Sequence, residues 1–195
     1  ITLSATAANV TIGNAAANRN VFVKIRADQT WTNNSASTLN IRNSAAASHS
    51  ASGNVVLTLN AAGSGAISNS GAFSDGTAGR LGLMIYSFRF GAVWVWGSNI
   101  TGCAKIKRGV LQANGAAGTQ TVLLGDTSGT NAARLHLATT TVNSNNITVQ
   151  AGNSGALSLT GVTGSEFAGN ILLNNNRVLG SLSGGATVTF SGIIS

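Results

Sequence analysis

The residue types that most often carry chemistry are scarce in this sequence of 195 residues. Its four acidic residues are Asp28, Asp75, Asp126 and Glu166, which lie 40 to 51 positions apart. A glycosidase needs two carboxyl groups facing each other across the bond that it cleaves. Spacings this wide could bring two of them onto one face only if the chain stacks regular turns. Asp75 in Ser-Asp-Gly and Asp126 in Gly-Asp-Thr also have the context of ordinary turns, which is the interpretation we favour.

The other reactive side chains form no recognisable site. His49 lies in a polar Ser-His-Ser segment, and His136 alternates with two leucines and so points outward from a strand. Neither has a nearby Cys or carboxylate, so both are poor candidates for zinc ligands. Cys103 is the single cysteine and cannot form an internal disulfide. Since nucleophile-elbow, P-loop and dinucleotide motifs are also missing, we expect no enzyme, no cofactor and no metal.

The sequence does contain one dense cluster of aromatic residues. Five of the ten aromatic residues lie within eleven positions. With one arginine they form a candidate interaction patch, made of Tyr86, Phe88, Arg89, Phe90, Trp94 and Trp96. On a strand, the first three rings share one face and the two tryptophans share another. Two interpretations are open: the rings fill a wide core, or they form an exposed patch that docks a neighbouring subunit or a sugar.

Basic residues outnumber acidic ones by eleven to four, which gives a net charge of +7. The densest group is Lys105, Lys107 and Arg108, a candidate basic contact. The remaining basic residues are thinly spread, whereas a nucleic-acid binder gathers its charge on one face and adds base-stacking aromatics. We therefore expect no nucleic-acid partner. Acidic polysaccharide, a cell-surface glycan or anionic lipid headgroups suit this charge better.

The elements that must position these residues are short strands. Gly, Asn, Ser and Thr make up close to half of the chain, proline is absent, and apolar residues alternate with polar ones over three to six positions. This pattern predicts strands with tight corners and almost no helix. The predicted strands are Val10–Ile12, Val21–Arg26, Leu39–Arg42, Val55–Leu59, Thr121–Leu124, Arg134–Leu137, Ile147–Val149, Ile171–Leu173, Val178–Leu179 and Val188–Phe190.

An internal repeat predicts that these strands stack as a β-solenoid. Leu57–Ser68 aligns without gaps to Ile147–Ser158, with six of twelve positions identical, and Leu179–Phe190 is a related strand-turn-strand unit. Coils of roughly 20–25 residues would give about eight or nine turns and a rod about 40 Å long. The alternative architecture is a β-sandwich, which also has many short strands. We favour the solenoid because of the repeat and the glycine and asparagine content.

Two segments resemble the autotransporter-associated β-strand (passenger-associated) repeats. Gly97–Leu111 resembles their signature G-A-N-T-Y-T-G-G-T-T-I-N-A-G-x-L, with one residue deleted near Ile100. Asp28–Asn33 resembles the sequence A-D-Q-T-W-T-N with which such repeats open, and Gly109–Ser195 has a residue pattern similar to theirs. The matching signature positions are Gly97, Asn99, Thr101, Gly102, Ile106, Gly109 and Leu111. The chain departs from the pattern where Cys103, Lys105, Lys107 and Arg108 replace small residues, and where Leu81–Trp96 is more aromatic.

This resemblance implies a right-handed parallel β-helix that is exported to the bacterial cell surface. We expect residues 1–195 to be a single solenoid module, a segment of a longer chain, since no signal peptide opens it. Its most apolar stretch, Leu81–Trp96, is too short to span a membrane. The expected function is a non-enzymatic, extracellular structural or adhesive fibre. Its partners are copies of itself or adjoining repeats, with acidic polysaccharide or a cell-surface glycan as a further ligand. The alternative is a polysaccharide-binding or polysaccharide-cleaving β-helix protein.

Overall fold

The structure, a computed structural model, describes residues 1–13, 23–42, 47–49, 53–69, 73–75, 79–87, 92–98, 102–117, 120–175, 178–180 and 186–195. Throughout these ranges the backbone is strand, turn, bend or irregular, without a helix. Accordingly, none of these segments supplies a helix with the length and hydrophobicity needed to cross a membrane. The strand pairs of the described part are parallel, which excludes a sandwich of antiparallel sheets and confirms a parallel β-solenoid.

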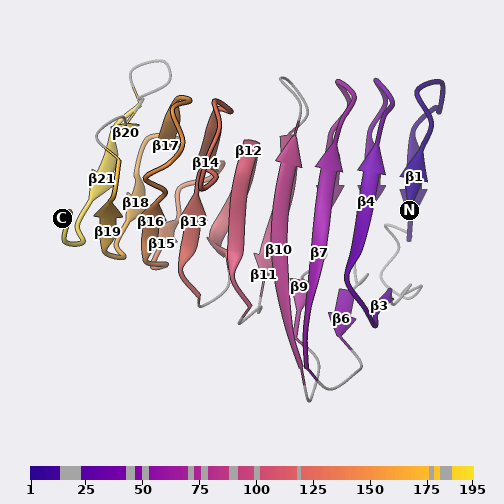
Figure 1. Cartoon of the computed structure of the whole chain (residues 1–195), viewed down its shortest axis with the longest axis horizontal. Coiled ribbons are helices and arrows are strands. Elements are labelled where there is room, and N and C mark those ends of the chain that lie inside the picture. The colour runs from indigo at the N-terminus through magenta and orange to yellow at the C-terminus, as the bar shows by residue number, and fades with distance from the viewer. Residues whose placement is uncertain are drawn as a thin grey trace.

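The first ladder runs the length of the molecule (Figure 1). Because each strand pairs with the equivalent strand of the next turn, its backbone donors and acceptors are satisfied along the axis. The two chain ends lie at opposite ends of this axis. In order, the ladder contains β1 (Thr2–Leu3), β4 (Gln29–Asn33), β7 (Gly53–Ala61), β10 (Gly79–Ser87), β12 (Ala104–Ala117), β13 (Val122–Leu124), β16 (Ile147–Val149) and β19 (Ile171–Leu173).

The second ladder lies beside the first and shares β12 with it. The first part of β12 pairs with β10 and β13, while the second part pairs with strands of the second ladder, so one sheet continues around the corner. The other members are β2 (Val10–Ile12), β5 (Leu39–Ile41), β8 (Ile67–Asn69), β11 (Ala92–Ser98), β14 (Ala133–Leu137), β17 (Leu157–Gly161) and β20 (Val178–Gly180).

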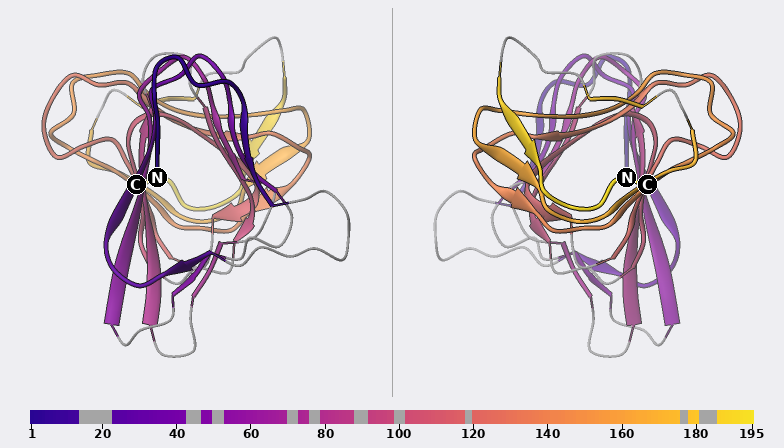
Figure 2. Two further views of the ribbon diagram at one scale, coloured as in Figure 1. Left: turned by 90° about the vertical axis from the view of Figure 1, so that its right-hand side faces the viewer. Right: turned by 90° about the vertical axis from the view of Figure 1, so that its left-hand side faces the viewer.

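Two short ladders close the third side of the turns. One contains β3 (Lys24–Ile25), β6 (Ala47–His49) and β9 (Phe73–Ser74), and the other contains β15 (Val142–Asn143), β18 (Ser165–Phe167) and β21 (Val188–Phe190). Viewed along the axis, successive turns superimpose around a common interior (Figure 2). Each turn therefore runs from the first ladder to the second and returns along the third side.

Columns of buried side chains fill that interior. In the first ladder a continuous column is formed by the register partners Trp31, Leu59, Ile85, Ile106, Leu124 and Val149. In the second ladder the equivalent column is Leu39, Ile67, Val93, Leu111, Leu135 and Leu159. Each fully buried aliphatic side chain contributes about 1.5–3 kcal/mol. The apolar alternation seen in the sequence thus marks the side chains that face inward.

Buried asparagines shape the corners between the ladders. The Asn33 Oδ1 atom accepts a hydrogen bond from the Ser35 N–H at 3.0 Å, and its Nδ2 group donates to the carbonyl oxygens of Ser37 and Ala66. Asn143 and Asn153 accept in the same way from the residue two positions on. An asparagine side chain can hold such a turn without a positive φ, because its amide imitates a backbone group.

The internal repeat occupies equivalent positions in two turns. Leu57 and Ile147 both lie in the first ladder, and Ile67 and Leu157 both lie in the second. The third copy lies elsewhere, because Leu179 belongs to the second ladder and Phe190 to the third side. Turn length also varies more than the predicted 20–25 residues: Thr2 pairs with Thr32, thirty residues on, whereas Ala104 pairs with Val122, eighteen residues on.

Candidate functional site

The three residues of the predicted basic contact lie along β12, but they face different surroundings. Lys105 lies on the outer face of the first ladder, between its register partners Met84 and Leu123. The Lys107 Nζ atom lies 3.3 Å from the Asp126 Oδ1 atom and forms an ion pair. Arg108 lines a hollow beside the second ladder. A register shift after Ile106 leaves Lys105 opposite Met84 and Arg108 opposite Tyr86 in β10. The basic contact as a whole stays a prediction.

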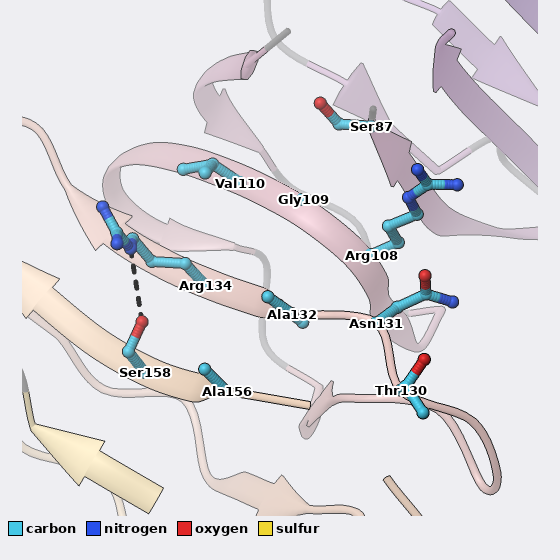
Figure 3. Close-up of a pocket in the computed structure, with 11 residues that line it drawn as sticks. Ser87, Arg108, Gly109, Val110, Thr130, Asn131, Ala132, Arg134, Ala156 and Ser158 are labelled. Atoms are coloured by element: carbon cyan, nitrogen blue, oxygen red, sulfur yellow. Dashed lines mark hydrogen bonds between the residues drawn. The ribbon is translucent and has the colours of Figure 1, made fainter. Parts of the chain in front are cut away.

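The hollow exists because β12 turns the corner without a loop. In the following turns, residues 125–132 connect β13 to β14, and residues 150–156 connect β16 to β17. In β12 the corner is made by Gly109 alone, which has a φ of 82°. Most L-amino acids avoid this conformation, and glycine tolerates it. Where the loop is missing, the surface is recessed by a volume of about 480 Å³ (Figure 3).

The walls of the hollow carry positive charge, small side chains and hydrogen-bonding groups. Eleven described residues line it, and none of them is acidic or aromatic. They are Ser87, Arg108, Gly109, Val110, Thr130, Asn131, Ala132, Ala133, Arg134, Ala156 and Ser158. The volume lies in the range of about 300–1,000 Å³ that is typical of ligand sites.

The two arginines lie at opposite ends of the hollow (Figure 3). Arg134 is exposed on β14, where its backbone pairs with Val110 and Ser158. Its Nε group donates a hydrogen bond to the Ser158 Oγ atom at 3.2 Å, which limits the rotamers that the side chain can adopt. A guanidinium group presents a planar fork of donors that matches a carboxylate or a sulfate.

Ser87 contributes a buried hydroxyl group to the wall. The side chain is 1% exposed, and its Oγ atom has no hydrogen-bond partner. It lies directly against Gly109, where an added Cβ atom would overlap the Ser87 Cβ atom. A buried hydroxyl without a partner costs about 1–3 kcal/mol. Such a group is rare enough in folded proteins that its position beside a hollow is informative.

His136 lies on the outer face of the same ladder, as its alternation with Leu135 and Leu137 predicts. Its Nδ1 atom is 2.9 Å from the Thr160 Oγ1 atom in the neighbouring turn. Burial lowers the pKa of His136 below its usual value, and the positive charge of Arg134 lowers it further. At neutral pH this imidazole is therefore uncharged and adds nothing to the positive charge of the hollow.

The structure describes only part of the predicted aromatic patch. Tyr86 is half-buried at the end of β10, and its backbone pairs with Asn60 and Arg108. Trp94 and Trp96 lie in β11, where they pair with Gln112 and Asn114, but their side chains lie outside the described residues. Phe88, Arg89 and Phe90 lie entirely outside the described residues, backbone included. Both interpretations of the patch, core and exposed surface, stay predictions.

The four carboxylates interact with nearby backbone or polar groups. Each aspartate accepts a hydrogen bond from a backbone N–H, and only the bond to Asp126 comes from an adjacent residue. The donors are Val56 to Asp28 at 2.8 Å, Leu81 to Asp75 at 2.7 Å and Thr127 to Asp126 at 2.8 Å, while Glu166 accepts from the Ser191 hydroxyl. Among the described residues, no three His, Cys, Asp or Glu side chains lie close enough to hold a metal ion.

Cys103 lies on a second, smaller hollow of about 200 Å³ with Arg80, Met84 and Lys105. Its S–H group donates weakly to the Thr121 carbonyl oxygen at 3.6 Å. Burial raises the pKa of this thiol, and the positive charge of Lys105 opposes the increase. The thiol is therefore protonated at neutral pH and is a poor nucleophile.

Sequence reasoning identified Arg108 but missed the residues that complete the hollow. Arg134 was predicted only as the first residue of the strand Arg134–Leu137, and Asn131 and Ser158 are unremarkable in so polar a chain. The available signal was Gly109 directly after Arg108, with the next apolar strand residues only about a dozen positions on, at Val122–Leu124. That short spacing marks a turn without a corner loop.

Comparisons of this chain with protein-family models, with curated proteins and with solved structures found no match.

Proposed function

We propose that this protein is a non-enzymatic, extracellular structural or adhesive β-solenoid that builds a bacterial cell-surface fibre by end-to-end or lateral association. The observation that carries the proposal is the open end of each ladder. Among the described strands, β1, β2, β20 and β21 each have a neighbour on one side only. Unpaired backbone groups at such an edge are a template for a further strand.

Exposed apolar side chains gather near the C-terminal edge and support the same proposal. Residues 193–195 pair with β19 to form the last rung of the first ladder. Ile193 is 69% exposed and Ile194 is 53% exposed, and Leu172 and Leu173 of β19 are also exposed. Covering them with another turn, from the same polypeptide or from a second copy, would remove this apolar surface from water.

We further propose that the solenoid is right-handed, has eight or nine turns and is one module of a longer chain. The order of the first ladder, in which β1 is linked through the described strands to β19, supports the number of turns. The resemblance of Gly97–Leu111 to autotransporter-associated β-strand repeats supports the handedness and an outer-surface location. The composition of this chain, which has one cysteine and is rich in Asn and Thr, suits an exported protein.

Electron microscopy of negatively stained protein tests the assembly. Fibres, or oligomers that lengthen with concentration, are expected for the native chain. The variant Ile193→Lys places a charge in the apolar edge and should shorten or abolish them. The variant Thr127→Lys adds the same charge to an exposed corner loop and should have no effect. Isolated particles with the size of a single protein molecule at every concentration would contradict assembly.

A polysaccharide-binding function is the second candidate, and the hollow that contains Arg108 and Arg134 favours it. Its cleaving form would need carboxylates, so Asp75→Asn and Asp126→Asn should abolish the release of reducing ends from a polysaccharide. A native protein that releases none from a panel of glycans would restrict this candidate to binding.

A further inference from the structure

The outer face of the first ladder carries two adjoining hollows. The strands β4, β7, β10 and β12 lie side by side there (Figure 1). The larger hollow, of about 380 Å³, extends from Asp28 across β7 to Met84, and the smaller one, of about 200 Å³, extends from Val56 across β10 to Lys105. Val56 and Met84 line both hollows, so these two side chains form a ridge between them.

A glycine in the middle of β10 creates the smaller hollow. Leu81 and Leu83 are buried, so Gly82 between them faces outward. It lies in an unbroken run of pairs with β7 and its φ is not positive, so neither a bulge nor a turn requires a glycine there. The nearest atom to an added Cβ would be the Cys103 carbonyl oxygen at 3.3 Å, a tight contact that a shift of a few tenths of an ångström relieves. A glycine inside a regular strand costs stability and often marks a place where another chain approaches closely.

The ridge presents apolar surface at the centre of this face. Val56 and Met84 are half-buried, and Thr30 and Thr58 lie beside them. Packing a second sheet on the face would remove the ridge from water. Facing sheets lie about 10 Å apart, and their side chains interdigitate. A ridge between two hollows therefore fits the hollows of an identical face.

Opposite charges lie on the two sides of the ridge. Asp28 is exposed and lines the larger hollow, whereas Arg80 and Lys105 line the smaller one. The Asp28 Oδ1 atom accepts a hydrogen bond from the Val56 N–H, which holds the carboxylate beside the ridge. Within the described residues, no ion pair joins Arg80 or Lys105 to a carboxylate. A face that is acidic on one side of an apolar centre and basic on the other is complementary to itself.

A two-fold axis determines how two such faces meet. An axis parallel to the strands, between β7 and β10, sets β7 opposite β10 of a second copy and β4 opposite β12. The register places Asp28 in the same row of the ladder as Val56, Gly82 and Cys103. Asp28 of each copy then lies opposite the smaller hollow of the other. In the same row, Val56 of each copy lies opposite Gly82, where no side chain obstructs it.

We propose that a second copy of this chain packs on this face about that axis. The Asp28 carboxylate of each copy enters the smaller hollow of the other, near Arg80 and Lys105, and the Val56 side chain covers Gly82. Because a two-fold interface makes every contact twice, two sets of charge contacts flank the apolar centre. This inference specifies the lateral association within the proposed function and rests on it.

Sedimentation equilibrium tests the face in the variant Ile193→Lys, which blocks the end-to-end contact and leaves this face intact. A dimer with a dissociation constant of about 100 µM or tighter is expected, since an interface of this size is weak. Adding Asp28→Lys or Lys105→Glu alone places like charges opposite each other and should weaken the dimer about tenfold. The two changes together should dimerise more tightly than either alone, which a folding defect would not explain.

A charge control and a chemical cross-link sharpen the test. Lys24→Glu makes the same charge change at an exposed position on the third side and should alter the dissociation constant less than about threefold. Thr30→Cys brings a thiol close to Cys103 of the second copy, so a bismaleimide that spans about 10 Å should link the two copies. Thr140→Cys, on an exposed corner, should give no linked dimer.

The interface would be overturned by a monomer at every concentration or by equal effects of Lys105→Glu and Lys24→Glu. A monomer that binds alginate fragments through Lys105 would assign the face to another ligand and overturn it as well. If the native chain still forms fibres in any of these cases, end-to-end association stands and only the lateral contact fails.

Discussion

Gly109 is the residue on which the β12 corner depends. Its φ of 82° and its contact with Ser87 leave no room for a side chain. We predict that Gly109→Ala lowers the melting temperature by about 8 °C or more, since strain and overlap together cost roughly 3 kcal/mol. Circular dichroism at increasing temperature measures the change.

Gly129 supplies the matched control, because it has a φ of 103° but nothing within 4 Å of an added Cβ atom. Gly129→Ala should therefore show backbone strain alone, a loss of about 3 °C. If the two variants melt at the same temperature, the Ser87 contact has no energetic importance.

His136 makes stability depend on pH. Its pKa in the folded chain lies below the ordinary value, so the unfolded chain binds the proton more strongly. Its contribution is complete above the unfolded pKa of about 6.5 and decreases as the pH falls toward the folded pKa. We predict that the native protein loses stability between pH 7 and pH 5, measured by urea unfolding.

The variant His136→Gln can keep a hydrogen bond to Thr160 without taking up a proton. It should flatten the pH profile in that interval, whereas His49→Gln should leave the His136 contribution in place. An unchanged slope in His136→Gln would assign the pH dependence to other groups.

At the level of elements, the corners depend on asparagine side chains. Asn33 is fully buried and makes three hydrogen bonds with backbone groups. Asn33→Asp keeps the shape but removes both donors and adds a charge, so we predict a loss of roughly 3 kcal/mol, or about 10 °C in melting temperature. Asn34→Asp changes an exposed neighbour and should have little effect. Similar melting temperatures for both variants would contradict this role.

The predicted strands correspond to ten of the twenty-one strands that the structure describes, whereas the corners were not predicted. Alternation such as Leu135-His136-Leu137 follows directly from one buried and one outer face, so it marks strands reliably. The continuous strand β12 was not predicted, because Gly109 in its middle is usually a sign that a strand has ended. The lengths of the turns were not predicted either. Pairing between stacked strands fixes the position of each strand, but it does not fix the number of residues in the loop that leads to that strand.

The candidate site was predictable only in part, for the same reason. Arg108 stood out within a run of basic residues, but Lys105 and Lys107 next to it lie in other surroundings. Arg134 lies 26 positions further on in the sequence, and only the register of β12 with β14 brings it to the hollow. Proximity across turns depends on exact coil length, which composition and periodicity do not specify.

At the scale of the whole molecule, most contacts join neighbouring turns, so stability should decrease toward the ends. We predict that amides of β7, β10 and the first part of β12 exchange with deuterium at least about tenfold more slowly than those of β1 and β19. Mass spectrometry of peptides after timed exchange measures this. Uniform protection in dilute, unassembled protein would instead indicate a single cooperative unit. Fibre assembly should selectively slow exchange at the two ends.

The eighteen-residue turn at Ala104 and the thirty-residue turn at Thr2 pack in the same ladder. The axial repeat therefore tolerates large differences in the peptide that connects two strands. A foreign peptide grafted between Thr127 and Thr130, on an exposed corner, should be displayed at the surface without disturbing the scaffold. The same freedom would let natural variation reshape what each corner recognises while the rod itself stays constant.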